Sequence, residues 1–352
     1  MAEPRIVVVG AGIVGSAIAY RLARQGCSVT VIDASGPGSG ATAGSFAWIN
    51  AHDASDAGYF EMRMRSIKAW RGLANEVPDL AVSFCGCMDW EVPATAMIDQ
   101  VASHKALGHD VRVMGKGEIE DLVPAIAAPG AAIWSPDDGA VDPDKIAQQL
   151  LAAACTAGAD LKSGKVIGLG DGGREITLEG AAVIAADHCV IAAGLGSVNL
   201  IRTLGLDLPL GASPGLIVRT DPLPGLLKSV LTTPDVHVWQ LSDGRLVAGS
   251  DYGGTFSPES AEDTIAGIHK ALRALLPDVN EIKITDKRIT NRPMPADGRP
   301  ILGPVPGYGH LSIAVMHSGV TLAPVVAQLI TESIVDGTND GFEAYRLDRF
   351  IN

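Results

Sequence analysis

The sequence predicts a mixed α/β (α+β) protein that joins a parallel sheet to a second, strand-rich part. Three observations predict this class. The first 33 residues read as strand, helix and strand, the unit that sets two parallel strands side by side. Strand patterns then dominate residues 211–290. Hydrophobic residues make up 47% of the 352 residues, which is enough to bury a large core of one or two domains.

The charge balance indicates which partners the protein can bind, and the cysteines indicate its cellular compartment. With 27 basic and 40 acidic residues the formal net charge is −13, and no basic cluster is present, so no nucleic-acid partner is expected. The most apolar stretch, residues 6–19, is broken by glycines and predicts no membrane span. Five scattered cysteines and an N-terminus without a signal pattern predict reduced thiols in a cytoplasmic protein. Cys85 and Cys87 have no second ligand pair nearby, so no metal site is predicted.

The N-terminal elements follow from local patterns. A run of strand formers over Arg5–Val9 leads at once into a glycine-rich turn. Apolar residues at helical spacing predict a helix over Ile13–Arg24, and Gly26 ends it. Residues 28–32 form a second strand with Asp33 at its end.

The following segment departs from a simple repeat. Residues 35–45 form a loop dense in Gly, Ser and Thr. Apolar residues on one face predict a helix over about 59–73, and another is expected over about 96–108. Asp142 as N-cap and Pro143 in the first turn predict a helix that runs from there to residue 157.

The second half alternates strands with two further helices. The Asp243-Gly244 pair predicts a hairpin turn, and residues 258–276 read as an amphipathic helix. Residues 317–321 open a last helix that runs to about residue 335. Strands are expected over residues 166–169, 176–178, 183–184, 188–192, 215–220, 236–241, 246–250 and 311–315.

The glycines after the first strand carry the strongest functional signal. Gly10 permits a tight turn, Gly12 lets a pyrophosphate approach the backbone, and Gly15 allows the helix and strand to pack closely. The helix N-terminus offers N–H groups and a partial positive charge to phosphates. Asp33 can accept hydrogen bonds from both ribose hydroxyls, which disfavours a 2′-phosphate. The pattern indicates a dinucleotide site and by itself leaves FAD and NAD open.

Two later features favour FAD over NAD. The loop at 36–45 directly follows the second strand, where a simple NAD domain continues into a helix. At the far end of the chain, residues 317–321 form a second strand-to-helix turn. A helix N-terminus there can face a flavin pyrimidine ring and stabilise the negative charge that develops on reduction. An oxidised nicotinamide carries positive charge and gains nothing from this arrangement.

The sequence resembles the D-amino-acid oxidase superfamily of FAD-dependent amine oxidoreductases, in particular its glycine oxidase and sarcosine oxidase branch. The resemblance covers most of the chain and is most specific near its two ends. The motifs that carry it are Val9-Gly-Ala-Gly-Ile-Val-Gly15, Ser39-Gly-Ala-Thr42, Gly139-Ala-Val-Asp-Pro143, Val190-Ile-Ala-Ala-Gly194, Arg292-Pro-Met-Pro-Ala-Asp-Gly298, Pro300-Ile-Leu-Gly303-Pro and His317-Ser-Gly-Val-Thr-Leu-Ala-Pro324.

The resemblance implies a Rossmann-type FAD-binding domain with an inserted substrate domain built on a large antiparallel sheet. The FAD domain is expected to combine residues 1–80, 140–210 and 288–352, and the substrate domain residues 81–139 and 211–287. It also implies hydride transfer from the substrate α-carbon to flavin N5 and an imine product that hydrolyses. Such chemistry mainly needs orientation and desolvation.

Cofactor contacts are carried over residue by residue from the matching motifs. Val166 resembles the position whose backbone contacts adenine, and the glycines fit places where the backbone runs close to the cofactor. The predicted contacts are Gly10, Gly12, Ile13, Val14, Gly15, Asp33, Ala34, Ser39, Gly40, Ala41, Thr42, Ser45, Phe46, Val166, Ala193, Gly194, Gly303, His317, Ser318, Gly319, Val320 and Thr321.

The substrate contacts rest on fewer residues. Arg292 matches the arginine that binds a substrate carboxylate in the family, and its planar guanidinium suits that contact; a structural ion pair with Asp297 is the alternative. Tyr252 is expected to offer a hydroxyl to the substrate, and His52 follows the cofactor loop with Trp48 and Asn50 to roof the flavin. His237 and Trp239 share one strand face, directed either to the pocket or to a core.

Two departures from the family pattern bear on the chemistry. The turn at 316–321 has no cysteine and the loop at 36–47 has no histidine, so non-covalent FAD is expected, with His52 and His317 as the remaining candidates for a linkage. No lysine occurs between Lys228 and Lys270, where sarcosine oxidases place the residue that speeds oxygen reduction. The electron acceptor is therefore O2 or a quinone or other acceptor.

The leading hypothesis is an FAD enzyme that oxidises the C–N bond of a small amino acid or secondary amine. An FAD-dependent 2-hydroxy acid dehydrogenase is the first alternative. The second is a flavoprotein subunit of a hetero-oligomeric dehydrogenase, and a homo-oligomer is also compatible with the sequence. A protein that binds only NAD is the remaining alternative.

Overall fold

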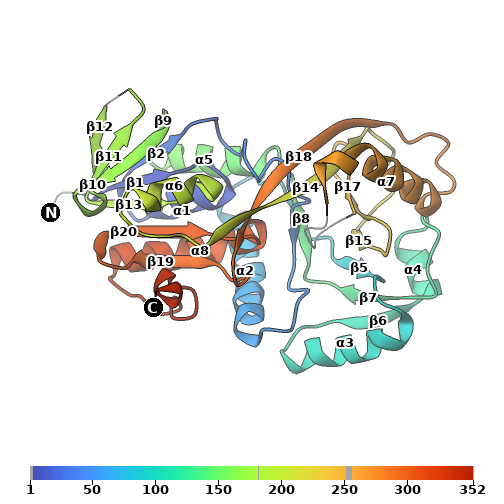
Figure 1. Cartoon of the computed structure of the whole chain (residues 1–352). Helices are drawn as coiled ribbons and strands as arrows, with labels where there is room; N and C mark the ends of the chain where they lie inside the picture. The colour runs from blue at the N-terminus through green and yellow to red at the C-terminus, as the bar shows by residue number, and fades with distance from the viewer. Residues whose placement is uncertain (1–2, 181, 251–255, 352) are drawn as a thin grey trace.

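The computed structural model describes residues 3–180, 182–250 and 256–351. Figure 1 shows two bodies side by side, connected by two long strands, β14 (Leu210–Thr220) and β18 (Ile284–Pro295). These strands pair antiparallel from Leu210 opposite Pro295 to Thr220 opposite Ile284. The predicted mixed α/β class is confirmed. The predicted domain boundary at residue 288 falls inside β18, which runs unbroken from one body toward the other.

The first body is built on a six-stranded sheet in the order β19-β20-β13-β1-β2-β9, in which only the β19–β20 pair is antiparallel among the described pairs. Parallel strands are usually covered on both faces, and alternate residues of β1 enter two different cores. The strands are β1 (Arg5–Val9), β2 (Ser28–Asp33), β9 (Asp160–Ser163), β13 (His188–Ile191), β19 (Ile301–Val305) and β20 (Tyr308–Val315).

Helices cover one face of this sheet and a small sheet covers the other. The helical face carries α1 (Ile13–Arg24), α2 (Ala57–Glu76), α5 (Ile146–Thr156) and α8 (Gly319–Val335), which share a core with Ile6 and Val8. The opposite face carries α6 (Ser197–Arg202) and the strands β10 (Val166–Gly170), β11 (Glu175–Leu178) and β12 (Val183–Ala185). Within the described ranges no helix is both long and apolar enough to cross a lipid bilayer.

The second body is built on an eight-stranded sheet in the order β18-β14-β17-β16-β15-β5-β7-β6. Its pairs are antiparallel except that β5 runs parallel to β15, so the expected large antiparallel sheet contains one parallel pair. Its shorter strands are β5 (Cys87–Asp89), β6 (Arg112–Gly115), β7 (Ala131–Ser135), β15 (Val230–Thr232), β16 (His237–Gln240) and β17 (Leu246–Gly249).

The two faces of the eight-stranded sheet have different neighbours. One face packs against α4 (Lys116–Leu122) and α7 (Ala261–Leu275), and α3 (Ala94–Ala106) packs on β6 and β7. The other face packs on Phe46 and Ala140, beside a small sheet of β3 (Trp48–Ile49), β8 (Gly139–Val141) and β4 (Val82–Ser83). This second face is therefore directed toward the cofactor loop predicted at 36–45.

Most predicted elements are confirmed within a few residues, and one helix start is wrong. The helix expected to open at Asp142 begins at Ile146, because residues 139–141 are strand β8 and residues 143–145 form a turn. Asp142 caps that turn instead, accepting from the Asp144 backbone N–H at 3.0 Å. The strand β18 was not predicted in full because prolines in its last residues weaken the strand pattern.

Candidate functional site

An elongated cavity of about 1370 Å³ lies between the two bodies. Residues from the carboxyl ends of β1 and β2, from the 36–45 loop, from β14 and β18, and from the start of α8 line it. All predicted cofactor residues line this cavity apart from Gly15 and Gly303. The cavity therefore brings together residues from both ends of the chain, as the two-ended FAD pattern predicts.

The turn from β1 into α1 forms one wall of the cavity. Gly10 has a φ of +106°, and a Cβ there would lie 2.5 Å from the Ala192 carbonyl oxygen, so only glycine fits. A Cβ on Gly12 would have only the Thr42 hydroxyl within 4 Å, at 3.5 Å, which leaves its cavity side open. The first turn of α1 carries no acidic residue and no side-chain cap. Its N-terminus can therefore receive an anion such as a pyrophosphate.

Two of the predicted glycine contacts have a packing role and lie away from the cavity lining. A Cβ on Gly15 would lie 1.9 Å from the Gly10 carbonyl oxygen, in agreement with close packing of helix on strand. Gly303 in β19 has a φ of +100°, and a Cβ there would lie 2.9 Å from the Phe342 ring. The neighbour Phe342 thus explains the glycine at position 303, and the contact of Gly303 with FAD stays a prediction.

Asp33 accepts hydrogen bonds from the loop that follows β2, and it also lines the cavity. Its Oδ1 accepts from the backbone N–H groups of Ser35 and Gly36, both at 2.8 Å, and its Oδ2 accepts from Ala11 N at 2.7 Å. A carboxylate has about four acceptor sites, so roughly one remains, on Oδ2, for a ribose hydroxyl. This is fewer than the two ribose contacts expected from the sequence.

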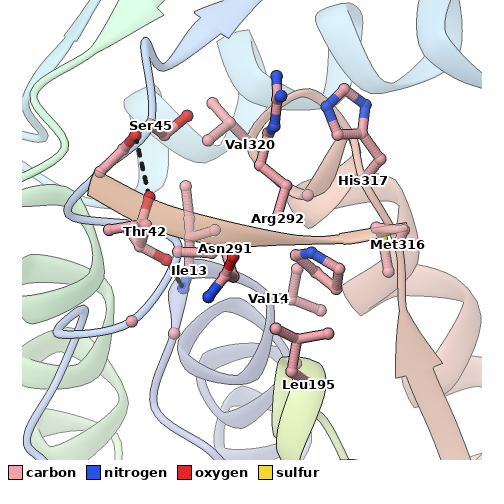
Figure 2. A pocket seen from close by; sticks show the side chains of 18 of the residues that line it. Ile13, Val14, Thr42, Ser45, Leu195, Asn291, Arg292, Met316, His317 and Val320 are labelled. Carbon is pink, nitrogen blue, oxygen red and sulfur yellow. Dashed lines mark hydrogen bonds between the residues drawn. The ribbon is translucent and has the colours of Figure 1, made fainter. Parts of the chain in front are cut away.

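The loop hydroxyls hold the cofactor loop against α1. Thr42 Oγ1 is buried and accepts from the Ile13 backbone N–H at 3.1 Å, as Figure 2 shows. Ser45 Oγ accepts from Ala47 N at 2.9 Å, and Ala47 has a φ of +62°, a left-handed conformation that is unusual for alanine. These hydroxyls therefore shape the loop, and their direct contact with FAD stays a prediction.

The start of α8 forms a neighbouring part of the wall, since a Cβ on Gly319 would lie 3.2 Å from the Val14 side chain, and α2 anchors it. Pro324 has no N–H, so the Val320 carbonyl loses its usual partner four residues along the helix. Trp70 Nε1 donates to that carbonyl at 3.0 Å. Ser66 Oγ donates to the Thr321 carbonyl at 2.6 Å and accepts from Val325 N at 3.4 Å. The first turn of α8 is thus held in place with its N-terminus on the cavity.

Arg292 lies on β18 with its side chain on the cavity. Its Nη2 donates to Ser213 Oγ at 3.1 Å and to the Pro214 carbonyl at 3.0 Å. A Cβ on Gly215 would lie 3.3 Å from the guanidinium carbon, so this glycine leaves room for the arginine. Among the described residues, Arg292 and Asp297 form no ion pair, which was the alternative. Asp297 pairs instead with Arg349, at 2.8 Å.

His317 stands beside Arg292, and Figure 2 shows the two side chains directed the same way. Burial, together with the positive charges of Arg292 and Arg63, lowers the pKa of His317 to about 4. The imidazole is therefore neutral at physiological pH. A neutral ring here avoids a third positive charge beside two guanidinium groups.

Several residues of the cavity wall were missed or left open by the sequence. Arg63 from α2 donates to Ser318 Oγ at 2.9 Å and to Asn50 Oδ1 at 3.2 Å. Glu91 lines the cavity and accepts from His237 Nε2 at 2.6 Å. His237 thus faces the cavity, whereas Trp239 on the same face packs in a core and donates to the Phe46 carbonyl.

The remaining predicted residues are placed as follows. His52 lines the cavity together with Trp48 and Asn50, which agrees with a roof above the flavin. Tyr252 lies outside the described residues. Among the described residues that line the cavity none is a cysteine. Phe46, Val166, Ala193, Gly194, Ser318 and Gly319 also line it.

Comparison with known proteins identifies the family to which the chain belongs. Residues 5–333 match the family described as FAD dependent oxidoreductase. The chain belongs to this family. It is an FAD-dependent oxidoreductase, and its residues fit the cofactor: the N-terminus of α1 can take the pyrophosphate, and the N-terminus of α8 lines the same cavity.

Three similar proteins cover nearly the whole chain. The glycine oxidase of Geobacillus kaustophilus is 26% identical over 94% of this chain and 92% of its own, and its crystal structure shares the fold with a TM-score of 0.88 at 24% identity, over 99% of this chain and 100% of its own. The hydrogen cyanide synthase subunit HcnC of Pseudomonas aeruginosa is 27% identical over 90% of both chains. The iminodiacetate oxidase of Chelativorans sp. BNC1 has a TM-score of 0.85 at 25% identity, over 97% of this chain and 98% of its own.

Proposed function

We propose that this FAD-dependent oxidoreductase oxidises the C–N bond of a small amino acid or secondary amine. The observation that carries the proposal is Arg292, a guanidinium directed into the same cavity as the N-terminus of α8. A planar guanidinium binds a carboxylate through two parallel hydrogen bonds, so a substrate with a carboxylate is favoured. The names of the glycine oxidase and iminodiacetate oxidase relatives support the same class.

Different residues of the chain bind the substrate and hold the binding groups in place. Arg292 fixes the carboxylate end of the substrate, and Ser213 and Pro214 hold the guanidinium in place. When bound, FAD supplies the acceptor for a hydride. The positive end of α8, which lines the cavity, would stabilise negative charge on a bound flavin. Because His317 is neutral, it adds no further positive charge beside Arg292.

The substrate amine must be neutral before a hydride can leave its carbon, because an ammonium has no lone pair to form the imine. The imine product then hydrolyses in water to a carbonyl compound and an amine or ammonia. Enclosure in the cavity orients the carbon toward the cofactor and excludes competing reactions, which supplies much of the catalysis in such sites. No lining residue is needed as a strong acid for this sequence of steps.

A second candidate is a flavoprotein subunit that passes electrons to a partner subunit. The 27% identity with a protein named as a subunit of hydrogen cyanide synthase favours it. The electron acceptor is then a partner or a quinone and not O2. We further propose that FAD is bound without a covalent link, since the described lining residues include no cysteine.

The decisive experiment is an anaerobic screen of amino acids and secondary amines for bleaching of the flavin absorbance. Arg292→Ala should raise the substrate Kd about 10- to 100-fold, the value of one charge-assisted contact, and leave the flavin spectrum unchanged. Arg202→Ala, an exposed arginine on α6, is the matched control. An unaltered Kd in Arg292→Ala would remove the carboxylate role. Bleaching that is not reversed by air would favour the subunit, and precipitation with acid tests the non-covalent link.

A further inference from the structure

A group of metal-ligating side chains lies in and behind the cavity wall. Ligand atoms of His52, Asp89 and Glu91 all lie within 4.8 Å of one another. The cross-strand register explains part of this arrangement. Asp89 on β5 lies opposite Thr232 on β15, which lies opposite His237 on β16. Their side chains therefore share the sheet face that is directed toward the cavity.

Each carboxylate of the group has one oxygen fixed and one without a partner. Asp89 Oδ1 accepts from Thr232 Oγ1 at 2.9 Å and from Glu91 N at 3.0 Å. Its Oδ2 is buried and has no hydrogen-bond partner. Glu91 Oε1 accepts from His237 Nε2, which leaves Oε2 for another ligand. Outer partners that orient ligand carboxylates in this way are typical of metal sites.

The buried Asp89 oxygen is directed at the imidazole of His52. The Asp89 side chain is 5% exposed, and its Oδ2 lies 3.8 Å from His52 Nδ1, which is too long for a hydrogen bond. Ligands of one Zn²⁺ ion sit about 2.0–2.2 Å from it, so their atoms lie roughly 3.5 Å apart. The side chains of His52 and Glu91 are each about a third exposed and can rotate to close the remaining gap.

The local charge also favours a cation. Within the described residues, no lysine or arginine lies within 4 Å of either carboxylate, and the only ion-pair partners are His52 and His237. A buried carboxylate oxygen without a partner is costly. A divalent ion would offset that cost and balance the two negative charges.

We propose that His52, Asp89 and Glu91 bind a divalent transition-metal ion of the Zn²⁺ class in the wall of the substrate cavity. One nitrogen and two carboxylate oxygens suit such an ion. His52 and Glu91 line the main cavity, whereas Asp89 lies behind them beside a small second cavity. The open coordination position therefore faces the molecule in the main cavity. The cysteine pair considered from the sequence is not involved.

The test uses the FAD-loaded protein, freed of metal with a chelator and then dialysed against Zn²⁺. Metal content per chain, measured by elemental analysis, should reach one Zn²⁺ with a Kd of about 10 µM or tighter. Asp89→Asn and Glu91→Gln should each weaken binding at least tenfold. Asp53→Asn is the matched control, because Asp53 is adjacent to His52 and lines the cavity but lies outside the group.

The outcomes separate the site from unspecific binding and from misfolding. The flavin spectrum and melting temperature of each variant report whether it is folded, and Glu91→Gln decides the question if Asp89→Asn loses FAD. Absence of stoichiometric binding in the wild type overturns the proposal. So does Zn²⁺ affinity that is unchanged in folded Asp89→Asn or Glu91→Gln, or that falls equally in Asp53→Asn.

Discussion

Replacement of Trp70 by phenylalanine should destabilise the protein through the first turn of α8. The indole N–H of Trp70 donates to the Val320 carbonyl at 3.0 Å and to the Thr321 carbonyl at 3.2 Å. Pro324 cannot supply the N–H that normally bonds Val320. Phenylalanine removes the donor and leaves a buried carbonyl without a partner. Because its ring is smaller than the indole, it also leaves a small cavity at this fully buried position.

The size of the effect follows from the cost of a buried unsatisfied group. That cost is about 1–3 kcal/mol. The unfolding entropy per residue is about 2.1 cal/mol/K, or roughly 0.7 kcal/mol/K for this chain, so the lost hydrogen bond alone should lower the melting temperature by about 1–4 °C. Because the first turn of α8 lines the cofactor cavity, FAD affinity should fall as well.

A double-mutant cycle tests the reasoning directly. Pro324→Ala restores a backbone N–H four residues after Val320, so Trp70→Phe should cost about 1 kcal/mol less in that background. Unfolding midpoints in urea for the four proteins give the coupling energy, and quenching of FAD fluorescence gives the affinity. Equal costs of Trp70→Phe in both backgrounds would refute the pairing of the indole with the proline.

Three further predictions concern the cavity and the sheet. Gly215→Ala places a Cβ 3.3 Å from the Arg292 guanidinium carbon; substrate KM should rise about tenfold with an unchanged flavin spectrum, in steady-state assays. Thr42→Val removes the acceptor of the Ile13 N–H and should weaken FAD binding about fivefold by titration. Burial, together with the nearby His310, lowers the pKa of His188 to about 4; the unfolded chain therefore binds the proton first as pH falls from 6.5 to 4. In that window the wild type should lose up to about 3 kcal/mol more stability than His188→Gln, measured by urea unfolding at pH 7 and pH 4.5.

The N-terminal unit was predictable from the sequence because its constraints are local. The turn after β1 needs a positive φ at Gly10 and close packing at Gly15, and both appear as glycines within a few residues. The bounds of β1 and α1 are the predicted ones. The start of α5 was not predictable in the same way, since strand β8 uses the residues before Asp142 to pair with β3 and β4.

The places of Glu91 and Arg63 in the cavity wall were beyond sequence reasoning because they depend on long-range contacts. Glu91 follows a three-residue strand and has no motif of its own. It meets His237 only because β5 pairs with β15 and β15 pairs with β16. Arg63 lies on a helix whose apolar face was predicted, yet its contact with Ser318 spans 255 positions. Only the assembled fold brings such residues together.

The strands β14 and β18 couple the substrate cavity to the cofactor loop through two arginines. Arg219 on β14 is fully buried, and its Nη2 donates to the Ala43 carbonyl at 3.1 Å. Arg288 on β18 donates to the same carbonyl at 3.1 Å and pairs with Asp144. Both arginines therefore fix the 36–45 loop to the strand pair that carries Arg292 four residues further on. Four residues of a strand span about 13 Å, so a small shift of this strand pair moves the Arg292 guanidinium and the 36–45 loop together.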